Sequence, residues 1–193
     1  GKLSMTAVGR NDFTNLMAVR YGDAIIDGMR IMYNYYGMHG AGDENLPEED
    51  DEIVFAGSFT EYIDGPTPER RIDHKPELHY RLGISEIDGG LALSFKVQAR
   101  HKVSIQLEFA VRPEGFLEIG GQTLPLLDGE RHYLNGAARV VSGTDALEFD
   151  GDLIVQHREL AGGNFTKKPR MTSLIVAPRA PYAGVITIRG REA

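Results

Sequence analysis

The feature that most constrains this chain is a repeated pattern of short runs in which apolar and polar residues alternate. Each run is closed by a glycine or an Asp-Gly turn, and the pattern extends from about residue 4 to residue 189. Alternation with a period of two places successive side chains on opposite faces of a strand. No segment of ten or more residues shows the 3.6-residue period of an amphipathic helix. Ten or more strands must bury an apolar face against a second sheet, so the sequence predicts an all-β fold. We expect a two-sheet antiparallel β-sandwich of the large sandwich type, with little or no helix.

Two regions give the clearest expectations for individual strands. Residues 78–87 and 91–99 both alternate, and the Asp88-Gly89 pair between them predicts a hairpin with a type I′ turn. Residues 103–111 place Ile105, Leu107 and Phe109 on one face and Glu108 on the other. We therefore expect a strand with one face in the core and the other in solvent.

The chain of 193 residues fits a single domain, residues 1–193, with two long loops. Residues 37–52 begin rich in glycine and then become acidic, with too little apolar surface to offset the entropy of ordering. Residues 64–76 contain Pro66 and Pro68, which cannot donate to a strand ladder. Both segments are predicted to be loops.

Composition excludes several classes of function. The chain has no cysteine, which rules out disulfides, thiolate metal sites and thiol catalysis. Seven of its 28 acids lie between Asp43 and Glu52, and the other 21 balance the 21 Lys and Arg residues. Without a basic footprint, neither nucleic acid nor a membrane is expected as a partner. The glycine pairs do not lie between a strand and a helix, and no HxH or HExxH motif occurs, so no cofactor and no metal are expected.

Tyrosines form the candidate ligand-binding residues. Tyr33 and Tyr35 share one face of the strand expected over residues 28–36, Tyr36 lies on the other face, and Tyr62 and Tyr80 would extend this aromatic surface. Aromatic rings on a sheet can stack on the apolar face of a sugar ring. Sheet cores also use tyrosine, so core or interface packing is the alternative interpretation.

Two further groups of residues could have a catalytic or calcium-binding role instead of a purely structural one. The sequence His79-Tyr80-Arg81 could support proton abstraction from an acidic sugar, or it could be a set of strand residues with local hydrogen bonds. The acids from Glu48 to Glu52 could bind calcium, but they lack the Asp-x-Asp-x-Asp-Gly order of a calcium loop. A solvated run of charges is the simpler explanation.

Several short motifs resemble one family. They are Val-Arg-Tyr-Gly-Asp at residues 19–23, Met29-Arg30-Ile31, Tyr35-Tyr36-Gly37 and the strand beginning with His79-Tyr80. Together they resemble the C-terminal β-sandwich of bacterial (α/α)-toroid carbohydrate-active proteins, heparinase II/III-like and related. The resemblance implies a partner outside this sequence, an N-terminal catalytic domain of the same chain, against which the sandwich packs beside the substrate cleft. It transfers no catalytic residue, because no position matches a family active-site motif.

The expected function is therefore that of a non-catalytic accessory domain in a larger carbohydrate-active protein of the polysaccharide lyase or glycosidase-like kind. The methionine-free start inside a strand pattern also suggests a fragment of a longer chain. A large exposed apolar patch would favour this role. An independent carbohydrate-binding module is the first alternative, with polysaccharide as its partner and a groove lined by tyrosines. A small enzyme with a site assembled from strands is the second, favoured by a cleft in which ionisable groups such as His79, His101 and a carboxylate converge.

Overall fold

The structure is a computed structural model, which describes residues 2–7, 16–33, 39–40, 44–49, 51–60, 62–63, 72–73, 78–99, 105–112, 114–126, 132–151, 154–163, 166–176 and 179–193. All regular secondary structure in these ranges is β-strand. The strands are β1 (Leu3–Ala7), β2 (Met17–Tyr21), β3 (Ala24–Tyr33), β4 (His39–Gly40), β5 (Glu44–Glu49), β6 (Glu52–Thr60), β7 (Tyr62–Ile63), β8 (Ile72–Asp73), β9 (Leu78–Ile87), β10 (Gly90–Ala99), β11 (Ile105–Val111), β12 (Phe116–Ile119), β13 (Gln122–Pro125), β14 (His132–Asn135), β15 (Ala138–Ser142), β16 (Asp145–Asp150), β17 (Ile154–Gly163), β18 (Thr166–Val176) and β19 (Tyr182–Glu192).

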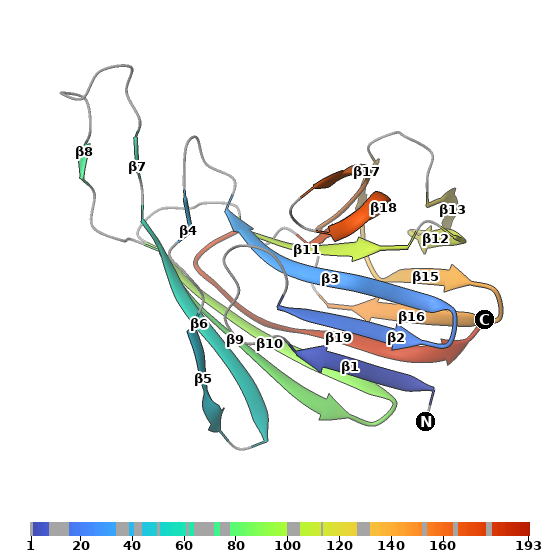
Figure 1. Cartoon of the computed structure of the whole chain (residues 1–193), viewed down its shortest axis with the longest axis horizontal. Coiled ribbons are helices and arrows are strands. Elements are labelled where there is room, and N and C mark those ends of the chain that lie inside the picture. Colours follow the sequence, from blue (N-terminus) through green and yellow to red (C-terminus); the bar gives the residue numbers. More distant parts are fainter. Residues whose placement is uncertain are drawn as a thin grey trace.

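Two large antiparallel sheets face each other (Figure 1). The first, here called sheet A, has the order β1-β2-β3-β11-β18-β17-β14. The second, sheet B, has the order β13-β12-β15-β16-β19-β10-β9-β6-β4, with β5 also paired to β6, and β7 and β8 form a separate ribbon. The predicted two-sheet antiparallel β-sandwich is confirmed. No helix that could cross a membrane is present in the described ranges.

The core lies between the two sheets and is built from the inward side of each alternating strand. Phe109 of β11 and Phe149 of β16 meet across the layers with ring centroids 5.2 Å apart and planes inclined at 69°. Both side chains are at most 1% exposed. Edge-to-face contact of this kind suits the quadrupoles of the two rings and joins sheet A to sheet B.

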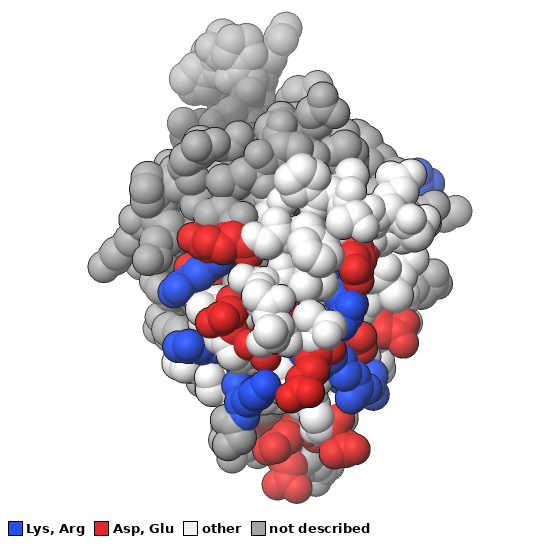
Figure 2. Space-filling view, turned by 90° about the vertical axis from the view of Figure 1, so that its right-hand side faces the viewer, with Lys and Arg blue, Asp and Glu red and all other residues white. Residues whose placement is uncertain are grey.

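A buried carboxylate joins the two sheets at the end where the β2–β3 and β15–β16 hairpins turn. Asp145 accepts a hydrogen bond from the backbone N–H of Asp23 at 3.1 Å and another from the Lys2 ammonium at 3.4 Å. Nearby, the Tyr21 ring lies against Gly190 so closely that a Cβ there would fall 2.0 Å from a ring carbon. Figure 2 shows this end, with acidic and basic side chains next to one another around an uncharged middle. At this end the two sheets are therefore held together by polar contacts as well as apolar ones.

The expectation that β11 has one solvent-facing side is wrong. Glu108 is 0% exposed, and Ala110 on the same side is equally buried. The neighbouring strand supplies the cover, because Arg30 of β3, itself 20% exposed, lies on the same side of the sheet as Glu108. Glu108 faces Arg30 directly across the ladder and accepts its hydrogen bond, so the buried carboxylate is paired.

Both predicted loops contain strands. Within residues 37–52 the structure has β4, β5 and the first residue of β6, and β5 pairs with β6. Within residues 64–76 it has β8, which pairs with β7. Local composition gave no sign of these strands, because each is specified by a partner elsewhere in the chain.

The β9–β10 hairpin is confirmed, with Ile87 paired to Gly90 across the two-residue turn. Its turn type differs from the prediction. Gly89 has a φ of 68°, while Asp88 is not among the described residues with positive φ. A type I′ turn requires positive φ at both positions, so this is another turn class.

Candidate functional site

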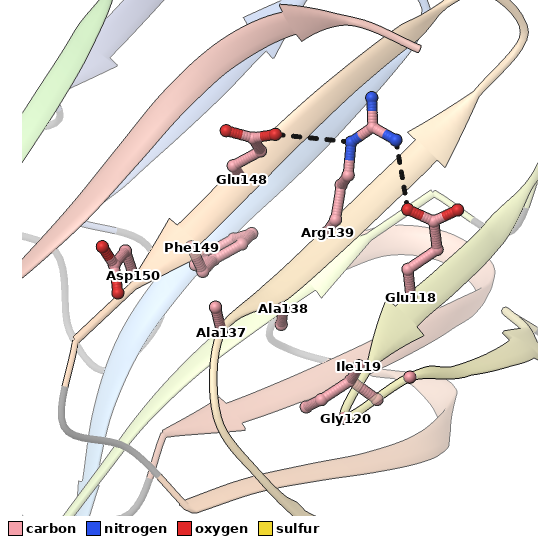
Figure 3. Close-up of a pocket in the computed structure, with 10 residues that line it drawn as sticks. Glu118, Ile119, Gly120, Ala137, Ala138, Arg139, Glu148, Phe149 and Asp150 are labelled. Carbon is pink, nitrogen blue, oxygen red and sulfur yellow. Dashed lines mark hydrogen bonds and ion pairs between the residues drawn. The ribbon is translucent and has the colours of Figure 1, made fainter.

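A charged cleft opens on the outer face of sheet B, over β12, β15 and β16. Its volume is about 430 Å³. The strand register aligns Glu118 with Arg139 and Arg139 with Glu148, so the three side chains form one row across neighbouring strands. Asp150 and the Gly120-Gly121 turn complete its margin (Figure 3).

Strand alternation explains why these three side chains share a face. Each lies between two apolar residues, in the sequences Leu117-Glu118-Ile119, Ala138-Arg139-Val140 and Leu147-Glu148-Phe149. The apolar neighbours are at most 2% exposed and point into the core. Their burial therefore forces the charged residue between them outward.

The turn at Gly120-Gly121 leaves one side of the cleft without side chains. The two glycines have φ values of 56° and 77°, and they connect Ile119 to its ladder partner Gln122. Positive φ at both central residues is typical of a type I′ hairpin turn, which glycine adopts without steric cost. The cleft is consequently open beside this turn.

Arg139 is held in place by three oxygen partners. Its Nη1 donates to Glu118 Oε2 at 3.1 Å, its Nη2 donates to the Glu192 carbonyl at 3.0 Å, and its Nε lies 3.5 Å from Glu148 Oε1. Glu148 also accepts from Arg191 Nε at 3.3 Å. The Arg139 side chain is 27% exposed, whereas the Glu118 and Glu148 side chains are 39% and 40% exposed. The arginine therefore serves as a fixed centre that orients two more accessible carboxylates.

Asp150 adds a third carboxylate at the margin. It is exposed, and in the described part of the chain it forms no ion pair. The cleft thus contains three carboxylates and one arginine, and the arginine is already paired with two of the carboxylates. The groups left for a ligand are mainly hydrogen-bond acceptors. Such a surface suits a ligand rich in hydroxyl or ammonium donors.

Of the five predicted tyrosines, the structure describes the side chain of Tyr80. Tyr80 is 3% exposed and belongs to the core, where its ring lies over Gly57 on the neighbouring strand. The backbone places Tyr33 at the end of β3 in sheet A and Tyr62 in the β7–β8 ribbon. Tyr35 and Tyr36 lie outside the described residues. For Tyr80 the structure favours core packing, and sugar stacking by the others stays a prediction.

Of the His79-Tyr80-Arg81 group, only His79 and Arg81 share a face of β9. His79 is exposed on the outer side of β9, Tyr80 points into the core, and Arg81 pairs with Glu52 at 3.1 Å. His101 lies outside the described residues. Among the residues that the structure describes, no three His, Asp or Glu side chains gather to hold a metal ion.

Glu118, Arg139, Glu148 and Asp150 were not among the residues predicted from the sequence. A signal was present, since each of the first three is a single charge between two buried apolar residues. Many strands have such a charge, however. The order β12-β15-β16, which brings these three together, comes from the tertiary structure.

Comparison with known proteins gives a likeness of fold. No protein family model and no curated protein matches the sequence. The crystal structure of a putative aldose 1-epimerase from Escherichia coli K12 superposes with a TM-score of 0.52 at 11% sequence identity, over 94% of this chain and 82% of that one. The likeness gives no support to the specific resemblance to the heparinase II/III-like C-terminal domain. At this level of identity it shows that this chain shares the β-sandwich fold of that protein.

Proposed function

We propose that this chain is a carbohydrate-binding β-sandwich domain and that glycan binds in the cleft formed by Glu118, Arg139, Glu148 and Asp150. The observation that carries the proposal is the row of two carboxylates held by one arginine in an open hollow of about 430 Å³. That volume lies within the range of about 300 to 1,000 Å³ usual for small-ligand pockets. Sugar hydroxyls donate hydrogen bonds, and carboxylate oxygens are strong acceptors for them.

The structural neighbour supports a sugar ligand by its name alone, since an aldose is a sugar and the fold is shared. A shared fold accommodates many functions, so the cleft residues carry the proposal. The cleft residues differ from the tyrosines expected from sequence. Recognition would accordingly depend on charge-assisted hydrogen bonds, with little aromatic stacking.

The accessory role in a larger carbohydrate-active protein remains part of the proposal. Packing against a catalytic domain would require an exposed apolar patch. In the described residues, Val185 at 53% exposure is the large hydrophobic side chain that is mainly exposed, and others such as Ile53 are only partly exposed. Glycan binding at the cleft is therefore better supported than packing against a catalytic domain. Co-expression of this domain with any further domain found in the complete reading frame would test that packing.

A small enzyme that acts on sugars is the second candidate. The cleft brings Glu118 and Glu148 to opposite sides of Arg139 (Figure 3). Two carboxylates beside one ligand can act as general acid and base. Turnover of a bound glycan, lost in Glu118→Gln and Glu148→Gln, would establish this function, and binding without turnover would establish the binding module.

Isothermal titration calorimetry against neutral, amino and uronic-acid oligosaccharides tests the proposal. Asp150→Asn removes a cleft charge at an exposed position, and Asp88→Asn removes one from the exposed β9–β10 turn as the matched control. A hydrogen bond to a charged group contributes about 1.5 to 3 kcal/mol, so Asp150→Asn should weaken binding by roughly 10-fold or more. The control should leave affinity unchanged. Absence of saturable binding to every glycan, or an equal loss in the control, would contradict the proposal.

A further inference from the structure

A second groove runs along the edge of the sandwich beside β1. Its volume is about 380 Å³. One wall is β1, the terminal strand of sheet A, and the opposite wall comes from β6, β9 and β10 of sheet B. Ile53, Ile84 and Leu91 supply its apolar surface, while Asp51 and Glu86 supply its carboxylates.

The backbone of β1 faces this groove with open hydrogen-bonding groups. In the described part of the chain β1 pairs with β2 alone. The Lys2 carbonyl accepts from the Gly22 N–H, which places Lys2 in a hydrogen-bonded pair with β2. Because pairs alternate in an antiparallel ladder, Leu3 and Met5 direct their N–H and C=O groups away from β2. Both of these residues line the groove.

The two acids of the groove are exposed and can accept a basic ligand. Neither Asp51 nor Glu86 forms an ion pair in the described part of the chain. The basic side chains of this region are engaged elsewhere, because Arg81 pairs with Glu52 and Lys2 pairs with Asp145 and Glu192. A basic ligand would complement this charge without displacing an existing partner.

We propose that this groove binds an extended, basic peptide segment of a partner protein, which adds to β1 as a further strand of sheet A. Backbone hydrogen bonds would form with Leu3 and Met5, an apolar side chain would cover Ile53, and a Lys or Arg would lie between Asp51 and Glu86. Addition of a strand to an open edge derives affinity from the main chain and specificity from alternate side chains.

A second copy of this chain fits the groove less well. β1 has the sequence Leu-Ser-Met-Thr-Ala, which contains no basic residue, and each chain carries a net charge of -7. Pairing two copies through β1 would bring acidic grooves together without a compensating cation. The charge of the groove therefore favours a basic partner over self-association.

Fluorescence anisotropy with a labelled hexapeptide of alternating lysine and valine tests the proposal, with the glutamate–valine hexapeptide as comparison. We expect saturable binding of the lysine peptide and at least 10-fold weaker binding of the glutamate peptide. The double variant Asp51→Asn/Glu86→Gln should weaken binding at least 10-fold. Asn suits position 51, because Asp51 has a φ of 65° and asparagine tolerates that conformation. The variant Asp88→Asn/Glu114→Gln makes the same charge change at exposed positions outside the groove and should bind normally.

Amide hydrogen exchange distinguishes strand addition at β1 from a general electrostatic attraction between the peptide and the acidic groove, because attraction alone would not protect the β1 amides. Binding at β1 should slow exchange of the Leu3 and Met5 amides at least 10-fold. Equal loss of binding in the control variant, or unchanged exchange at these two amides, would overturn the proposal. Protection of the same amides by self-association of the chain, without peptide, would also overturn it.

Discussion

The contact between Phe109 and Phe149 provides a direct test of how the two sheets are held together. The rings belong to different sheets, are almost fully buried, and meet edge to face at 5.2 Å. Replacing either phenylalanine with leucine keeps most of the apolar volume and removes the ring. We expect each single variant to lose about 1 to 2 kcal/mol of unfolding free energy, less than the roughly 3 to 5 kcal/mol of a Phe→Ala change.

The double variant isolates the contribution of the ring pair. Aromatic pairs add about 0.5 to 1.5 kcal/mol beyond area burial. The loss in Phe109→Leu/Phe149→Leu should therefore be smaller than the sum of the two single losses by about 1 kcal/mol. For a domain whose total stability is about 5 to 15 kcal/mol, this difference is measurable by urea unfolding.

A second cycle gives the control. Phe55 in β6 is also fully buried, but it lies four strand spacings from Phe149 in sheet B, or about 19 Å. Phe55→Leu and Phe149→Leu should thus be additive within about 0.5 kcal/mol. If the Phe109–Phe149 cycle were additive too, or if both cycles showed the same coupling, direct contact across the sheets would be refuted.

Two further predictions concern backbone strain and pH. Gly115 and Gly136 have similar φ values of 126° and 119°, but a Cβ would fall 1.9 Å from a carbonyl oxygen at Gly115 and would meet nothing within 4 Å at Gly136. Gly115→Ala should therefore lower the unfolding free energy by clearly more than the roughly 1 to 3 kcal/mol of backbone strain expected for Gly136→Ala, and equal losses in thermal unfolding would contradict the packing at Gly115. Hydrogen bonds to Glu192 and then Asp145 raise the pKa of Lys2 above its ordinary 10.5. Because the folded-state pKa is the higher one, the stabilisation is complete below pH 10.5 and is lost as pH rises through the folded value. Lys2→Met should remove this alkaline loss from urea midpoints measured between about pH 9 and 12, and an unchanged profile would contradict the ion pair.

Local patterns were sufficient to predict the architecture and several strands. The alternation in residues 78–87 and 91–99 places Leu82 and Leu93 in the core, as observed. The Asp-Gly pair between these runs marked the hairpin correctly. It did not determine the turn type, because Gly89 alone of the two turn residues has positive φ.

Burial of the outer faces could not be predicted from the sequence. Glu108 has the pattern of a solvent-facing residue in an alternating strand, yet it is fully buried beside Arg30. Alternation specifies which residues share a face, but the neighbours in the sheet decide whether that face meets solvent. Tyr80, by contrast, lies on the same face of β9 as Leu78 and Leu82, so the alternation itself is consistent with its place in the core.

Strand periodicity and turn residues act over short distances along the chain, so an antiparallel two-sheet sandwich without cysteine could be predicted from them. The strand order could not be predicted in this way. It places Glu118, Arg139 and Glu148 in one row and leaves the Leu3 and Met5 backbone at an open edge. Strand pairing joins residues that are far apart in the sequence. Because the hydrogen bonds are formed by the backbone, the sequence of one strand does not show which other strand it pairs with. Both proposed binding sites lie where that pairing brings separate segments together.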